Sequence, residues 1–149
     1  LHLSIRRQRQ MCIRDSSRLD MRDAAIYGDL NYQQLTDFVV NAGKELGLAV
    51  EMRQSDEESE IIHWLHEAAD LHLPVIINPA AFTHYSYAIR DAAELVKSTL
   101  IEVHLSNPLS REEFRHTSVI SGIANGTIAG FGAQSYRLAL IAIAAIDKR

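Results

Sequence analysis

The sequence predicts an α/β protein in which a parallel sheet carries helices on both faces. From residue 31 onward, stretches with helical periodicity alternate with short strand-like stretches. The apolar run that follows residue 73 is short and unbroken, as in a strand buried on both faces. Strands that alternate with helices pair in parallel, and their connecting helices cover the two faces.

The first helix and strand are expected between residues 31 and 55. Asn31 is a suitable N-cap for a helix over residues 32–46, whose apolar side chains fall on one stripe. Gly47 follows as the residue that ends the helix. Residues 48–55 alternate apolar and polar side chains, which is typical of a half-buried strand.

A second helix and a buried strand follow. Ser55 or Asp56 is expected to cap a helix that ends near Asp70, and its acidic first turn suits the positive end of the helix dipole. Residues 74–77 form the buried strand, which Asn78 closes. Ligands of such sheets bind beyond the carboxyl ends of the strands, so Asn78 lies where a ligand is expected.

The rest of the chain continues the alternation. Thr83 or His84 is expected to open a helix that runs to Lys97. The later elements are predicted as a strand over 99–104, a helical turn over 111–115, a strand over 126–130 and a helix over 135–146.

Composition excludes several classes of protein. The 149 residues are 47% hydrophobic and suffice for one domain with its own core. The single cysteine, Cys12, excludes a disulfide framework and a cysteine-based zinc site. The net charge of -4 argues against nucleic-acid binding. The longest apolar run is too short to span a bilayer, and we expect a cytoplasmic protein.

Charge divides the chain into two parts. Residues 1–18 hold five arginines and one acid, a net +4, whereas residues 19–149 hold ten basic and eighteen acidic residues, a net -8. A transit peptide is arginine-rich, but this segment lacks a starting Met and a clear amphipathic period. A basic arm that binds nucleic acid is possible, but the segment contains neither aromatic residues nor a nucleic-acid-binding motif that would support this interpretation. The string RRQRQMCIRDS resembles translated adapter or vector sequence, so we interpret 1–18 as a non-native or disordered leader and 19–149 as the domain.

Glu102 and His104 form a candidate acid–base pair. They are two residues apart on a predicted strand and therefore share a face. A carboxylate beside an imidazole fixes its tautomer and favours its protonated form, which suits a general acid. By spacing alone, a purely structural pair is the more frequent explanation of this pattern.

Two further groupings have weaker support. Asn78 and Pro79 precede Thr83 and His84, and an amide, a turn and a helix N-terminus together favour a bound carboxylate, although a structural turn is commoner. Arg22 lies five residues before Tyr27, and a guanidinium can lower a phenol pKa from about 10 enough to make it a base. A solvated arginine and a packing tyrosine are the alternative.

The motifs in order resemble the type II 3-dehydroquinate dehydratases over residues 18–146. The resemblance rests on RLDMRDAAIYG, RQSDEESEIIHWLHEA, VIINPAAFTHYSYAIRDA and IEVHLSNPLSREEFRHTSVISGIANGTIAGFG. It implies a flavodoxin-like three-layer sandwich and dehydration of 3-dehydroquinate to 3-dehydroshikimate in the shikimate pathway. It further implies that no metal or cofactor is needed, and that trimers pack into a dodecamer.

The resemblance also implies the catalytic residues. Tyr27 corresponds to the base that removes a proton beside the ketone, and Arg22 holds it near the tyrosinate state. His104 corresponds to the general acid for the departing hydroxyl, and Glu102 orients it.

Substrate contacts follow from the same resemblance. Asn78 and the backbone N–H groups of Leu105 and Ser106 correspond to the carboxylate-binding residues. His84 and Arg115 correspond to residues that contact the ring hydroxyls. Asp91 corresponds to a residue that reaches a neighbouring subunit's site, and residues 23–34 correspond to the lid.

The early NGPN motif of the family is absent. Its two asparagines fall on Cys12 and Asp15, and the family's first strand falls on residues 6–11, RRQRQM. Arginines buried in a central strand would lose hydration without partners. We therefore expect the first strand to be missing or replaced, and the chain as written to fold poorly or be inactive.

Two other functions fit the predicted fold. A flavodoxin-like binding module such as a receiver needs an aspartate phospho-acceptor, but the 74–77 strand ends in Asn78. A hydrolase would pair His104 with Ser106 or Ser118, but neither serine lies in a nucleophile elbow.

Overall fold

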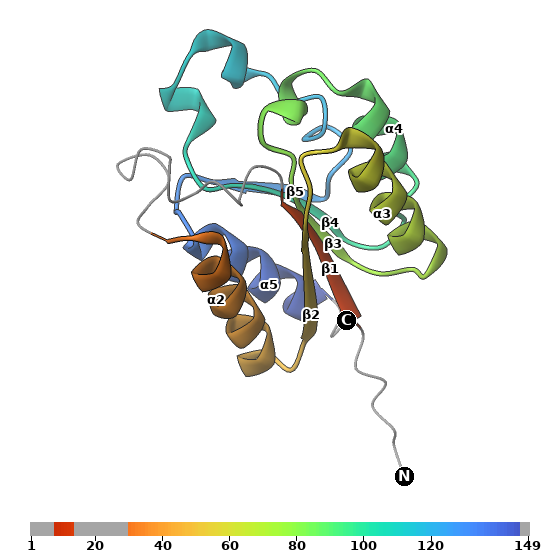
Figure 1. Cartoon of the computed structure of the whole chain (residues 1–149), viewed down its shortest axis with the longest axis vertical. Helices are drawn as coiled ribbons and strands as arrows, with labels where there is room; N and C mark the ends of the chain where they lie inside the picture. The colour runs from red at the N-terminus through yellow and green to blue at the C-terminus, as the bar shows by residue number, and fades with distance from the viewer. Residues whose placement is uncertain (1–7, 14–29, 147–149) are drawn as a thin grey trace.

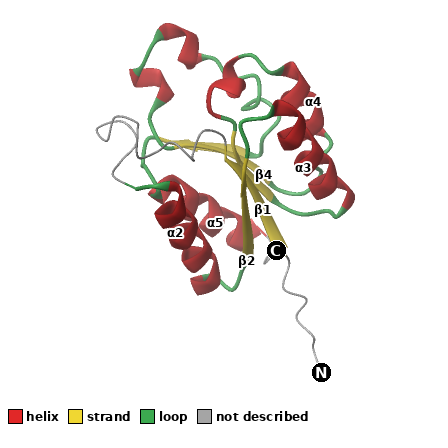
Figure 2. Ribbon diagram, viewed as in Figure 1, coloured by secondary structure: helices red, strands yellow, loops and turns green. Residues whose placement is uncertain are grey.

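In the computed structural model, residues 8–13 and 30–146 are described, and they form a parallel sheet between two pairs of helices (Figures 1 and 2). The strand order is β2-β1-β3-β4-β5, and every neighbouring pair is parallel. The strands are β1 (Gln8–Ile13), β2 (Ala49–Gln54), β3 (Val75–Asn78), β4 (Leu100–His104) and β5 (Gly126–Ala129). Helices α2 (Tyr32–Glu45) and α5 (Gln134–Ile146) cover one face, and α3 (Glu58–Asp70) and α4 (Tyr87–Glu94) cover the other. The predicted fold class is confirmed.

Helix α2 begins and ends where local signals predict. The Asn31 side chain accepts a hydrogen bond from the Gln34 N–H, and the Gln34 side chain accepts one from the Asn31 N–H. This reciprocal pair satisfies two N–H groups that the first turn leaves free. Gly47 follows the C-cap with a φ of 75°, a conformation that costs other residues about 1–2 kcal/mol.

The start of α3 differs from the prediction, because neither Ser55 nor Asp56 is its N-cap. The chain stays extended for longer, and Glu57 takes the cap position. The Ser55 hydroxyl instead accepts a hydrogen bond from the Glu57 N–H at 3.0 Å and donates one to Glu60. Ser55 thus stabilises the turn before the helix rather than the helix terminus itself.

The predicted helix from Thr83 or His84 to Lys97 is wrong at both ends. Ala80–His84 forms a separate 3₁₀ helix, η2, and α4 spans only Tyr87–Glu94. The N-cap is Ser86, whose hydroxyl accepts a hydrogen bond from the Ile89 N–H at 3.1 Å. Thr83 cannot fill this role because its hydroxyl is directed toward β4.

The alternation of side chains along β4 divides the core into two layers. Ile101 and Val103 pack with α2 and α5, whereas Leu100 packs with α3 and α4. Truncating one such fully buried aliphatic side chain to alanine costs roughly 2–5 kcal/mol. Glu102 and His104 point to the same face as Leu100. On this face, which α3 and α4 cover, the side chains of β4 change from apolar at its start to polar at its carboxyl end.

The prediction that the arginine-rich segment cannot form a central strand is wrong, because β1 lies between β2 and β3. Of the two expectations for the first strand of the family, missing or replaced, a strand without the NGPN motif is present. The backbone of β1 pairs with β2 on one side, Gln8 opposite Ala49, and with β3 on the other, Gln10 opposite Val75. Parallel pairing uses backbone N–H and C=O groups, which are available whatever side chains the segment carries. The described strand, Gln8–Ile13, includes Arg9 of the predicted range 6–11, and the first two residues of that range lie outside the described residues.

The 3₁₀ helices η3 (Pro108–Ser110) and η4 (Glu113–His116) lie in the long connection between β4 and β5. The turn predicted over 111–115 is thus one short 3₁₀ helix shifted toward the C-terminus. Among the helices of the described ranges, none has the length and apolar character required to cross a bilayer.

Candidate active site

Glu102 and His104 are hydrogen-bonded to each other at the carboxyl end of β4. The distance from His104 Nε2 to Glu102 Oε1 is 2.7 Å. Glu102 is fully buried, and His104 is 9% exposed. The prediction that the two side chains share a face of the strand is confirmed.

Three hydroxyl groups surround the same carboxylate, and we call them the hydroxyl cluster: Thr83, Ser118 and Ser121. Ser121 donates to Glu102 Oε2 at 2.6 Å, and Ser118 lies 3.1 Å from each carboxylate oxygen. Thr83 donates to Oε1 from the η2 helix. Segments far apart in sequence therefore meet at one buried charge.

The hydroxyl cluster and His104 keep Glu102 ionised. Burial alone would raise the pKa of the Glu102 carboxyl, because a charge is poorly solvated there. Hydrogen bonds from His104, Ser121 and Thr83 favour the charged form and outweigh burial, so the pKa lies below its ordinary value of 4.5. At neutral pH the buried group is a carboxylate.

The ionised carboxylate sets the tautomer of His104. A carboxylate only accepts hydrogen bonds, so the Nε2 atom that faces it must carry hydrogen. Nδ1 is then the ring nitrogen whose protonation can change. His104 lines the pocket at this end of the sheet, so its ring can exchange a proton with a bound ligand.

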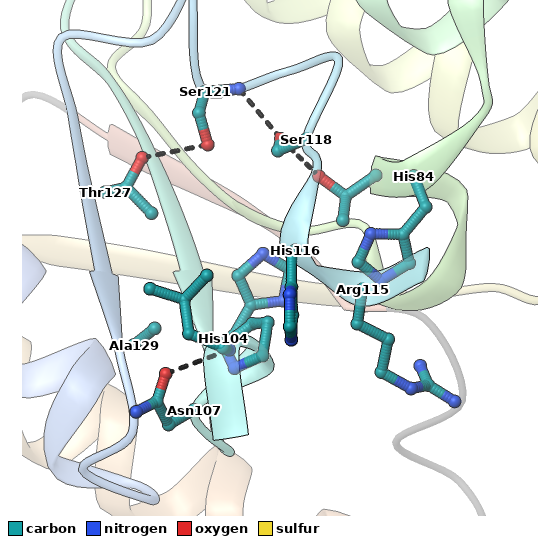
Figure 3. A pocket seen from close by; sticks show the side chains of 12 residues that line it. His84, His104, Asn107, Arg115, His116, Ser118, Ser121, Thr127 and Ala129 are labelled. Atoms are coloured by element: carbon teal, nitrogen blue, oxygen red, sulfur yellow. Dashed lines mark hydrogen bonds between the residues drawn. The ribbon is translucent and has the colours of Figure 1, made fainter. Parts of the chain in front are cut away.

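The pocket has a volume of about 210 Å³ and lies between the 3₁₀ helix η2 and the segments that follow β4 (Figure 3). His84, His104, Arg115 and His116 line it, together with the hydroxyl cluster. This lining suits a small ligand with a negative charge and several hydroxyl groups, because it combines a guanidinium with imidazole and hydroxyl hydrogen-bonding groups.

Arg115 and His84 are held in place by neighbours outside the pocket. Arg115 Nε donates to Glu112 at 2.7 Å, and its guanidinium carbon lies 4.6 Å from the centre of the Phe114 ring. His84 Nδ1 lies 2.8 Å from the Thr117 carbonyl oxygen, to which it must donate. In the neutral ring, His84 Nε2 is therefore the acceptor for a ligand hydroxyl.

The other predicted substrate-binding residues do not line this pocket. Asn78 ends β3, beside β4, and its Oδ1 accepts from the Ala80 N–H at 3.1 Å. Leu105 is buried, and Ser106 accepts a 3.4 Å hydrogen bond from Arg111. Asp91 is exposed on α4 and faces away from this chain's own core.

Arg22, Tyr27 and residues 23–29 of the expected lid lie outside the described residues. The rest of the lid range leads into α2, whose first turn includes Tyr32 and Gln34.

Sequence reasoning missed the hydroxyl cluster and His116. The sequence predicts Ser118 as a candidate hydrolase nucleophile and Thr83 as part of a helix N-terminus, and it links neither residue to Glu102. No local pattern links these residues to Glu102, because the contact joins positions 16–19 residues apart in sequence. Within residues 30–146, no three histidine, cysteine or acidic side chains are grouped as metal ligands.

This fold and site define an α/β enzyme with a buried carboxylate–imidazole pair at the C-terminal edge of a parallel sheet. Residues 15–144 match the sequence model of the dehydroquinase class II family. The chain belongs to that family.

Individual relatives agree. The chain is 52% identical over 128 residues to a 3-dehydroquinate dehydratase of Salinispora tropica, and the matched residues cover 86% of this chain and 90% of that protein. The crystal structure of the type II dehydroquinase from Propionibacterium acnes superposes with a TM-score of 0.91 at 45% identity, over 93% of this chain and 97% of that one. The crystal structure of the type II dehydroquinase from Butyrivibrio crossotus superposes with a TM-score of 0.87 at 39% identity, over 92% of this chain and 97% of that one.

The ionised state of Glu102 makes stability depend on pH. Because its folded pKa lies below 4.5, the carboxylate stabilises the fold above that pH, and this stabilisation is lost as the pH falls through the folded pKa. We expect Glu102→Gln to destabilise the protein by roughly 1–3 kcal/mol at neutral pH, since it leaves buried donors without a charged acceptor. The difference from wild type should shrink as the solution is acidified.

Urea unfolding at a series of pH values measures this difference. Glu45→Gln is the matched control, because Glu45 is an exposed carboxylate paired with Arg137 and should change stability by less than about 0.5 kcal/mol. A difference between wild type and Glu102→Gln that is constant with pH would show that Glu102 is not ionised in the fold.

Proposed function

We propose that the Glu102–His104 pair supplies the acid step of 3-dehydroquinate dehydration. The chain is a hydro-lyase of this family and acts in the shikimate pathway, where it converts 3-dehydroquinate to 3-dehydroshikimate and water. The observation that carries the residue assignment is the 2.7 Å bond between a buried carboxylate and an imidazole that lines the pocket.

The acid step follows from the geometry of the pair. Glu102 holds Nε2–H, so a proton on Nδ1 can pass to the substrate hydroxyl as its bond to carbon breaks. Water leaves, the imidazole becomes neutral, and the electrons of the enolate form the double bond of the enone. The buried carboxylate stabilises the imidazolium before transfer.

We assign the base step to Tyr27, which takes a proton from the carbon beside the ketone. Arg22 lies in the same RLDMRDAAIYG motif and favours the tyrosinate electrostatically. This assignment is supported by the family membership, whose matched range includes both residues.

The substrate contacts are proposals of the same kind. His84 and Arg115 line the pocket and are suited to the ring hydroxyls. Asn78 and the N–H groups of Leu105 and Ser106 are assigned to the carboxylate, because Asn78 ends β3 and the other two residues directly follow the adjacent strand β4. No cofactor or metal is required by this scheme, since the proton transfers use side chains alone.

A serine hydrolase is the weaker candidate. Ser118 lies 3.1 Å from both Glu102 oxygens. It accepts a hydrogen bond from the Ser121 N–H at 2.9 Å (Figure 3). In the part of the chain that the structure describes, neither Ser106 nor Ser118 is hydrogen-bonded to His104. A binding module without catalysis is the other alternative, and the following variant distinguishes it.

Replacing Tyr27 with Phe should abolish turnover while leaving the fold intact, because it removes only the phenol oxygen. We expect a fall in kcat of at least about 10²-fold, the usual range for loss of a general base. Ultraviolet absorbance of the enone product measures the rate, and circular dichroism checks the fold. Tyr85→Phe, at an exposed tyrosine, is the control. A Tyr27→Phe protein with unchanged turnover rules out this base.

The origin of residues 1–18 leads to a prediction about the missing NGPN motif. We propose that they are a non-native leader whose sequence lacks the NGPN motif. Substituting Cys12→Asn, Ile13→Gly, Arg14→Pro and Asp15→Asn together should raise kcat, because the motif restores polar groups beside the enolate. The same absorbance assay measures the gain. Full activity of the chain as given, with no gain on substitution, would overturn the interpretation of this segment.

The third prediction concerns assembly. We propose trimers that pack into a dodecamer in the cytoplasm, with exposed Asp91 reaching a neighbouring subunit's site. Light scattering after size-exclusion chromatography should then give a mass twelve times the 16.7 kDa of the chain. Asp91→Ala should lower activity in that assembly. A monomer with full activity would contradict this proposal.

A further inference from the structure

We propose that Ser121 is a positioning residue whose hydroxyl holds the Glu102 carboxylate against His104 and so fixes which nitrogen of the imidazole carries the reactive proton. This inference rests on the proposed role of His104 as general acid. It extends that role to the hydroxyl cluster defined above.

Ser118 has one hydroxyl hydrogen to donate, because its oxygen already accepts two hydrogen bonds. Its oxygen accepts from the Ile120 N–H at 3.1 Å and the Ser121 N–H at 2.9 Å. Two accepted bonds use the oxygen lone pairs, so the single hydroxyl hydrogen points to the carboxylate or to Thr83. Ser118 therefore shapes the loop as well as the carboxylate.

Ser121 makes the shortest hydroxyl contact to Oε2, the carboxylate oxygen that His104 does not contact. The distance is 2.6 Å, whereas Oε1 receives His104 Nε2 at 2.7 Å. Bonds to both oxygens fix the plane of the carboxylate and hence the direction of its bond to the ring. Without Ser121, the remaining donor to Oε2 is Ser118 at 3.1 Å, which also contacts Oε1.

The hydroxyl cluster also keeps the Glu102 carboxylate ionised, so that it only accepts hydrogen bonds. A neutral carboxyl could turn its own hydrogen toward the ring and stabilise the opposite tautomer, with Nδ1–H and a bare Nε2. Donors on both oxygens disfavour that form. His104 is consequently held with hydrogen on Nε2, and Nδ1 is the atom that gains and loses the catalytic proton.

Ser121 is the best member of the cluster to test. Ser118 supports the loop, and Thr83 is almost fully buried in η2. Ser121 is half-buried, and its N–H rather than its hydroxyl donates to Ser118. Its hydroxyl also accepts a 3.3 Å hydrogen bond from Thr127, whose side chain is exposed. Ser121→Ala thus removes the donor with little change in packing.

We expect Ser121→Ala to lower kcat by roughly tenfold with less than about a twofold change in KM, as is usual when the partner that orients a working side chain is removed. The acidic limb of the kcat profile should move to higher pH, because Glu102 loses a donor that favours its ionised form. The other titratable or charged groups of the pocket, His84, Arg115 and His116, are unchanged in this variant. Ser121→Thr keeps a hydroxyl and should restore both readouts.

Nitrogen-15 NMR of the His104 ring gives a readout that does not need turnover. Wild type should show hydrogen on Nε2, and Ser121→Ala should show a mixture of tautomers. Thr83→Val removes a second donor of the cluster while keeping a branched side chain, and should shift the tautomers in the same direction. Ser110→Ala is the control, since its exposed hydroxyl bonds only the Asn107 carbonyl oxygen.

The outcomes separate the two proposals. If neither wild type nor the variant with the restored NGPN motif makes enone, the proposed function fails whatever the tautomer. If wild type is active and Ser121→Ala matches it in kcat, pH profile and ring nitrogen shifts, the positioning role of Ser121 is wrong. A loss of activity that Ser121→Thr does not restore also overturns it, because the effect would then follow from packing rather than from the hydroxyl.

Discussion

The Glu102 carboxylate carries a negative charge at a position with no exposure to solvent. An unpaired charge buried in this way would cost several kcal/mol, so the surrounding segments must supply its hydrogen bonds. They do so from three directions: β4 itself, the η2 helix and the segment before β5. These segments form the walls of the pocket. The requirement to solvate one buried carboxylate thereby determines where the ligand site lies.

The sheet makes this arrangement possible by separating apolar packing from polar chemistry. Ile101 and Val103 fill the layer beneath α2 and α5, and neither faces the pocket. On the opposite face the β4 side chains change from Leu100, in the core, to Glu102 and His104. Because successive strand residues alternate in direction, the same five residues contribute to a core and to a site. The Glu102–His104 pair therefore lies on an interior strand of the sheet and not on a loop.

Local signals in the sequence account for most of the fold. The Asn31 cap, the Gly47 stop and the apolar run of β3 act within a few residues, and each was predictable. Two predictions fail because contacts between distant residues override local signals. Helix α4 begins after Ser86, because the Thr83 hydroxyl is hydrogen-bonded to the distant Glu102. Strand β1 forms by pairing with β2 and β3, although its arginine-rich composition argues against a central strand. The Glu102–His104 pair was predictable from its spacing, whereas the hydroxyl cluster arises from tertiary contacts that no local pattern encodes.

The central position of β1 has a consequence for how the sheet closes. It precedes the other described strands along the chain, yet it lies between β2 and β3, with Gln8 opposite Ala49 and Gln10 opposite Val75. During synthesis β1 therefore leaves the ribosome long before either neighbour exists. Pairings over such sequence separations form slowly, because the loop entropy is lost before the contacts are gained. In the described sheet, β2 is joined to β3, β4 and β5 only through β1. The strand β1, which is synthesised before both of its neighbours, is thus the one that joins β2 to the rest of the described sheet.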